Sequence, residues 1–98
     1  MGNSLKSARF LIDSRLADAL GGDDHACYDL GVAYSTGTEG VDYDLIEAHK
    51  WFNLAAVAGN VAAQAARAEI ADDMSAREIA MAQRAARAMI AANQRRAA

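Results

Sequence analysis

The chain has 98 residues, which is enough for one domain with a single modest hydrophobic core. Charged residues make up 23% of it and hydrophobic residues 53%, and the net charge is -3, a composition that excludes a disordered tail. The single cysteine, Cys27, excludes an intramolecular disulfide and a cysteine-rich metal site.

Five helices and no strand are predicted. Apolar residues recur at spacings of three and four, and alanine, the best helix former, makes up about a quarter of the chain. Short loops between helices of this length favour antiparallel neighbours, so we expect one lead helix followed by two helical hairpins. In chain order, the predicted helices cover residues 4–20, 24–35, 44–58, 61–73 and 76 towards 93.

Glycine and polar residues mark where these helices begin and end. Glycines follow the first and third helices, and two more in the loop over residues 36–42 permit a positive φ. The helix starts carry side chains that accept a backbone N–H bond, two of them with a glutamate in capping-box position. These signals are Gly21-Gly22, Asp23 or Asp24, Gly37 and Gly40, Asp44 with Glu47, Gly59-Asn60, and Ser75 with Glu78.

A repeat underlies these helices. Gly22–Ala26 aligns with Gly59–Ala63 at an offset of 37 residues, a suitable period for a helical hairpin. The first unit resembles a complete Sel1-like repeat, which is one of the TPR-like helical repeats. The positions that carry this resemblance are Ala26, Tyr28, Leu30, Gly31, Tyr34, Gly37, Gly40, Asp44, Ala48, Trp51, Phe52, Ala55, Ala56 and Gly59.

The resemblance implies an all-α fold, a short α-solenoid of antiparallel helical hairpins. The second unit is degenerate, because Arg67 stands where the first unit has Leu30. It resembles the closing hairpin of bacterial members, with the polar outer face that a solenoid end requires. The first segment is interpreted as a cap, or alternatively as an arm that docks on a partner. The division of the single domain 1–98 is then 1–22 capping helix, 23–59 Sel1-like repeat and 60–98 capping hairpin.

Gly31 is interpreted as a point where two helices cross closely. A side chain at this position would push the backbones apart, and Ala48, Ala55 and Ala56 supply a matching small surface. Trp51 is assigned to the core, where large aromatic residues supply the bulk that alanines lack.

No catalytic, cofactor-binding or metal-binding group of residues emerges from the sequence. His25 and Cys27 are two residues apart on a helix and point in different directions, so they do not share a metal or a proton. Cys27 is interpreted as a small half-buried packing residue, and His49 as a solvated residue at a rim. We therefore predict that the protein is not an enzyme and uses no cofactor or metal.

The resemblance implies an adaptor or an accessory subunit that binds another protein through a helical-repeat surface. The alternative is a small hydrolase-like or ligand-binding Sel1-type protein. No apolar run approaches the ~20 residues of a membrane helix, and the N-terminal segment lacks the pattern of a signal peptide. We therefore expect a cytoplasmic protein that does not insert into membranes.

The first candidate surface for a partner lies on the second predicted helix. In helical repeats the first helix of each hairpin usually lines the concave side. This points to His25, Asp29, Val32 and Thr36, with Gln64 of the next unit beside them. The surrounding carboxylates favour a basic or helical segment as the ligand.

The alternative surface is a stripe of Arg77, Arg84 and Arg95 on one side of the fifth predicted helix. Arginines dominate this part of the chain, whereas no basic residue stands between Arg15 and Lys50. The stripe would meet an acidic surface on a partner or on another copy of the chain, which would give a homo-oligomer. Nucleic-acid binding is not expected, because the aromatic residues lie in or near the acidic half.

Overall fold

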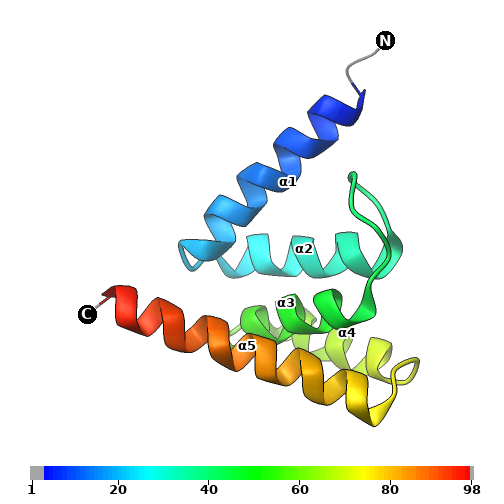
Figure 1. Cartoon of the computed structure of the whole chain (residues 1–98), viewed down its shortest axis with the longest axis vertical. Helices are drawn as coiled ribbons and strands as arrows, with labels where there is room; N and C mark the ends of the chain where they lie inside the picture. Colours follow the sequence, from blue (N-terminus) through cyan, green and yellow to red (C-terminus); the bar gives the residue numbers. More distant parts are fainter. Residues whose placement is uncertain (1–3, 98) are drawn as a thin grey trace.

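The computed structural model describes the backbone of residues 4–97 and the side chains of residues 10–95, and over this part of the chain it contains five α-helices and no strand (Figure 1). The prediction of an all-helical fold is confirmed. The fifth helix runs further than the sequence indicated, past Asn93. The helices are α1 (Ser4–Leu20), α2 (Asp24–Thr36), α3 (Leu45–Val57), α4 (Val61–Ala71) and α5 (Ala76–Ala97).

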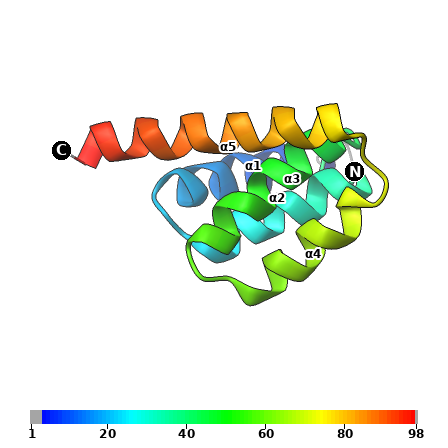
Figure 2. The same cartoon turned by 90° about the horizontal axis from the view of Figure 1, so that it is seen from below.

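The central element is α3, which packs against α2, α4 and α5, while α1 packs against α2. Figure 2 shows α5 along one side of the molecule and α4 on the other, with α3 between them. The two helices of the segment 60–98 therefore do not form the closely packed hairpin that the sequence predicted. The apolar side of α5 is buried at Ala82 and Ala86 and serves the contact with α3, whereas α4 buries only Ala63 among its described residues.

The helix starts are capped as the sequence predicted. Asp23 Oδ1 accepts the backbone N–H groups of His25 and Ala26 at 2.9 and 3.2 Å. Asp44 caps α3 and Asn60 caps α4 in the same way, at 3.1 and 2.9 Å. The capping box before α5 is complete, since Ser75 and Glu78 exchange both backbone-to-side-chain bonds, at 2.8 and 3.1 Å.

The loop between α2 and α3 is tied to α2 at both of its ends. Gly37 ends α2 in the left-handed conformation with φ 68°, and Gly40 has φ 83°, which confirms the need for glycine at both turns. The backbone N–H of Asp44 donates to the carbonyl oxygen of Tyr34 at 2.9 Å. These contacts fix both ends of the loop on α2.

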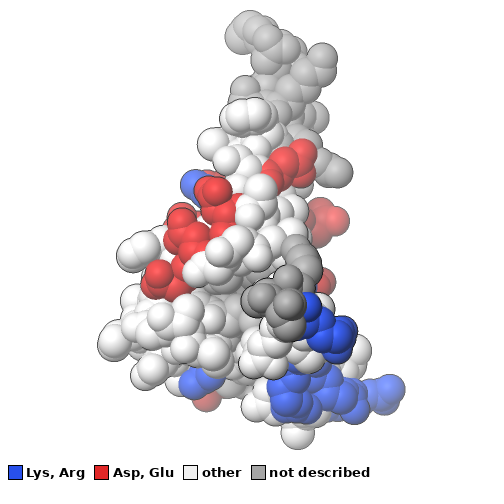
Figure 3. All heavy atoms as spheres, turned by 90° about the vertical axis from the view of Figure 1, so that its left-hand side faces the viewer, with Lys and Arg blue, Asp and Glu red and all other residues white. Residues whose placement is uncertain are grey.

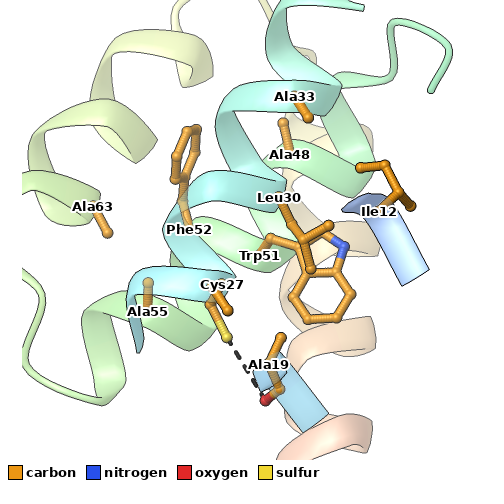
Figure 4. Packing of buried hydrophobic residues seen from close by; sticks show 11 residues of the cluster. Ile12, Ala19, Cys27, Leu30, Ala33, Ala48, Trp51, Phe52, Ala55 and Ala63 are labelled. Atoms are coloured by element: carbon orange, nitrogen blue, oxygen red, sulfur yellow. Dashed lines mark hydrogen bonds between the residues drawn. The ribbon is translucent and has the colours of Figure 1, made fainter. Parts of the chain in front are cut away.

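The core is built around Leu30, Trp51 and Phe52, the largest side chains that are completely buried. Figure 4 shows the rings of Trp51 and Phe52 on different sides of α3: Trp51 lies towards Ile12 of α1, and Phe52 lies towards α2 and α4. Small residues of α2, α3 and α4 fill the space around these rings. The assignment of Trp51 to the core is confirmed, since it is 2% exposed.

Gly31 is a point of close approach, but its neighbour differs from the expected alanines. A Cβ atom at Gly31 would lie 2.5 Å from two ring atoms of Phe52 and 2.9 Å from a third. The ring of Tyr28 also packs on Phe52, with centroids 5.6 Å apart. Phe52 therefore occupies the volume that a side chain at Gly31 would need.

Candidate functional site

The first surface predicted from the sequence is exposed, but its acidic residue is paired within the chain. His25, Val32 and Thr36 face solvent on α2, and Gln64 faces solvent on α4. The hydroxyl of Thr36 donates to the carbonyl oxygen of Val32 at 2.8 Å. Asp29 lies 3.8 Å from Arg15 of α1, so its negative charge is partly neutralised.

Arg15 connects three parts of the chain. Its guanidinium group contacts Asp29 on α2, and it also pairs with Glu39 in the loop before α3. This network was not foreseen, because nothing in the sequence indicates which of the many carboxylates lies beside Arg15. It holds α1 against α2 and places positive charge where the sequence suggested an acidic surface.

The arginine stripe on α5 is solvent-exposed. Arg77, Arg84 and Arg95 form no ion pair with any of the described side chains. Figure 3 shows acidic side chains over α1 and the start of α2, and basic side chains over α5 below them. The division of charge in the sequence therefore appears as two separate areas of the surface.

Two adjoining cavities lie between α3 and α5, and their residues were not singled out as a site from the sequence. The first has a volume of about 300 Å³ and is lined by Leu54, Val57, Met89 and Ile90, with the α1–α2 turn at its other side. The second has a volume of about 250 Å³, shares Val57 and Ile90 with the first, and extends to Arg87. We call the two cavities together the α3–α5 groove.

The α3–α5 groove combines an apolar floor with a polar rim. Val57, at the end of α3, is 70% exposed, so its apolar side chain is accessible to a ligand. Asn53 and Gln83 add hydrogen-bonding groups, and Arg87 is the charged residue among the described residues that line the groove. This arrangement suits an apolar ligand group with hydrogen-bonding or negatively charged neighbours.

Cys27 is fully buried, more deeply than the half-buried position that the sequence suggested. It is 5% exposed, and its Sγ atom lies 4.0 Å from the carbonyl oxygen of Ala19 (Figure 4). Burial, together with the nearby negative charges of Asp23 and Asp24, raises the pKa of the thiol to about 11. The thiol is therefore protonated at neutral pH and is a poor nucleophile.

The prediction that His49 is solvated is wrong. His49 is 3% exposed, and its Nδ1 atom lies 3.0 Å from Nδ2 of Asn53. Arg67 of α4 donates to Oδ1 of Asn53 at 2.8 Å. Because a guanidinium group only donates, this bond fixes the amide so that Nδ2 donates to His49, which must accept at Nδ1. His49 is thus neutral and carries its proton on Nε2.

A signal for this polar chain, in which His49 and Asn53 are buried and Arg67 is half-buried, was present in the repeat. Arg67 occupies the position that corresponds to Leu30, one of the residues without any exposure. An arginine at a position that corresponds to a core residue favours a polar partner nearby, because burying an unpaired charge is very unfavourable. The partner is Asn53, which in turn satisfies His49.

The stability of the fold should fall as the pH falls below 6.5, the ordinary pKa of histidine. Burial lowers the pKa of His49, and the positive charge of Arg67 lowers it further. Above pH 6.5 the residue is neutral in both the folded and the unfolded chain. Below pH 6.5, His49 binds a proton in the unfolded chain, whereas in the folded chain it stays neutral until the pH reaches its lowered pKa. Each pH unit in this window costs up to about 1.4 kcal/mol.

Urea unfolding at about pH 7.5 and at about pH 5.5, on either side of the ordinary histidine pKa, measures this loss of stability. The control variant is His25→Ala, which removes the exposed histidine and should retain the full sensitivity to acid. His49→Gln should reduce it. If His25→Ala abolished the sensitivity instead, the assignment to His49 would be wrong.

Within the described side chains, no group of three or more His, Cys, Asp or Glu residues is placed to hold a metal ion. No described helix is both long and apolar enough to cross a membrane. Comparison with protein-family models, curated proteins and solved structures finds no match to the chain.

Proposed function

We propose that this chain is a Sel1-like helical-repeat protein that acts as an adaptor or accessory subunit by binding another protein. The observation that carries the proposal is the open α3–α5 groove, whose apolar floor is exposed at Val57. Large exposed apolar surfaces rimmed by polar groups mark interaction sites in small soluble proteins. The proposal includes the solenoid architecture, with α2 and α3 as the repeat hairpin, and a cytoplasmic location.

Two structural details support the repeat assignment. Gly31 lies directly against the ring of Phe52, so the large side chain at one signature position requires the absence of a side chain at the other. Gly37 and Gly40 have positive φ angles in the loop that joins the two helices of the repeat. Positions that tolerate only glycine are the most specific part of the resemblance.

The charges of the molecule favour an acidic, amphipathic segment as the ligand of the groove. Arg87 lines the second cavity, and Arg84 and Arg95 are exposed on the same helix. On the α2 surface, by contrast, Asp29 already has Arg15 as a partner. An apolar residue of the ligand would enter between Val57 and Ile90, and its carboxylates would lie near Arg87.

The test is affinity capture from the native host followed by binding measurements with purified variants. Val57→Glu and Arg87→Glu should each weaken binding of the captured partner by about tenfold or more, since each places a carboxylate in the groove. Val32→Glu and Arg77→Glu are the matched controls, because they make the same changes on α2 and at the start of α5.

The controls are expected to leave the affinity unchanged. A loss confined to Val32→Glu would move the site to the α2 surface that the sequence first indicated. If no partner is captured and the purified chain binds no protein, the adaptor function itself is wrong.

A further inference from the structure

The inference concerns the way in which α1 is attached to the rest of the molecule. This helix packs against α2 and otherwise projects from the body of the molecule (Figure 1). Among its described side chains, Ile12 and Ala19 are buried and Leu16 is partly buried. This is a small apolar contact for a helix of 17 residues. Elements with few buried contacts open more easily than the rest of a fold.

The small contact nevertheless covers two chemically distinctive side chains. The carbonyl oxygen of Ala19 lies 4.0 Å from Sγ of Cys27, and Ile12 lies beside the ring of Trp51 (Figure 4). Cys27 is 5% exposed and Trp51 is 2% exposed. Movement of α1 away from α2 would therefore bring the thiol and one side of the indole ring into contact with solvent.

The connection between α1 and α2 has the properties of a hinge. It consists of Gly21 and Gly22, and Gly22 has a φ of 98°. A Cβ atom placed on Gly22 would meet no other atom within 4 Å, so the turn is not packed against its surroundings. Glycine can adopt many backbone conformations, and a change at one or two such residues is sufficient to swing a helix as a rigid body.

Polar contacts hold α1 in place on the side of α2. The guanidinium group of Arg15 lies 3.8 Å from Asp29 and also pairs with Glu39. Glu39 has a φ of 59°, which is unfavourable for a residue with a side chain, so this conformation depends on the contacts around it. All three side chains are partly exposed. Ion pairs of this kind are weak and are screened by salt.

We propose that α1 is a lid that opens about Gly22 while α2, α3, α4 and α5 stay folded, and that the ion pairs of Arg15 keep it closed. Opening exposes Cys27 and Trp51. It also removes Ala19 from the wall of the first cavity of the α3–α5 groove, so the groove has a different shape in the open chain. The proposal does not depend on the adaptor function, because it concerns a motion of the chain alone.

Alkylation of Cys27 by iodoacetamide, a neutral reagent, measures the opening, since the chain has no other cysteine. The rate for the folded chain, divided by the rate for the chain unfolded in urea, gives the fraction that is open. This fraction should be at least about tenfold larger than the globally unfolded fraction measured by chemical denaturation. Low urea concentrations should hardly change it, because the opening exposes little surface.

Variants identify the contacts that close the lid. Arg15→Gln should raise the alkylation rate by about threefold or more, since it removes two ion pairs. Arg77→Gln is the matched control on α5 and should leave the rate unchanged. Added salt should accelerate the reaction of the native chain but not that of Arg15→Gln. Asn53→Leu, which disturbs the contact of α3 with α4, should lower the global stability without changing the alkylation rate in water.

Three results would overturn the proposal. The first is a native rate that equals the rate allowed by global unfolding. The second is an Arg15→Gln variant that reacts no faster than Arg77→Gln. The third is an Asn53→Leu variant whose reaction accelerates in proportion to its loss of stability, because Cys27 would then become accessible only when the whole chain unfolds. Capture of a partner through the α3–α5 groove is independent of each of these results.

Discussion

Replacement of Gly31 by leucine is expected to lower the free energy of unfolding by about 1–3 kcal/mol. Even a single Cβ atom would lie 2.5 Å from the ring of Phe52, a contact that the structure cannot hold without a shift. The ring is 2% exposed and lies in the centre of the core, so it has little room to move. Chemical denaturation followed by circular dichroism measures the change.

The matched control is Val32→Leu on the next, exposed position of α2, which should change the stability by less than about 0.5 kcal/mol. Gly31→Ala tests the same contact more gently, because alanine also gains up to about 1 kcal/mol of helix propensity over glycine. Combined with Phe52→Leu, it should cost less than the two single changes added together. An unfolding midpoint that is unchanged in Gly31→Leu would contradict the close approach.

Replacement of Asn53 by leucine is the second change with a large expected effect. Asn53 donates to His49 and accepts from Arg67, and it is itself 8% exposed. Leucine would leave the Nδ1 atom of a buried histidine without a donor and a guanidinium group without its acceptor. We expect the variant to lose about 1–3 kcal/mol, the usual cost of an unsatisfied buried polar group.

Denaturation of the Asn53→Leu and Gln64→Leu variants in parallel separates the loss of these hydrogen bonds from a general effect of introducing leucine. Gln64 is exposed on α4, so its replacement should change the stability by less than about 0.5 kcal/mol. Replacing His49, Asn53 and Arg67 together by apolar residues should cost less than Asn53→Leu alone, because no polar group is then stranded. If Asn53→Leu were as stable as the native chain, the bonds to His49 and Arg67 would contribute nothing.

The local features of the fold were predictable because short-range rules determine them. Asp23, Asp44, Asn60 and the Ser75–Glu78 pair cap helices within three residues of themselves, so their roles follow from the sequence alone. The left-handed conformation of the loop glycines also depends only on the turns that contain them.

The features that were missed depend on contacts between distant parts of the chain. Whether His49 is buried depends on which face of α3 packs against the neighbouring helices. The spacing of residues around His49 is compatible with a buried and with a solvated position. The α3–α5 groove exists because α5 packs on α3, whereas the short connection after α4 suggested that α5 would pack on α4. Short loops determine which helices follow each other closely, but the sizes of the buried side chains determine which helices touch.

The central position of α3 has a mechanical consequence. This helix packs against α2, α4 and α5 at once, and its adjacent residues Trp51 and Phe52 extend to different sides of it. It cannot rotate to improve one contact without disturbing the other two, because a close-packed interior transmits displacement instead of absorbing it. Any ligand that wedges apart Val57 and Ile90 would therefore also displace α3 against α4, although α4 does not line the groove.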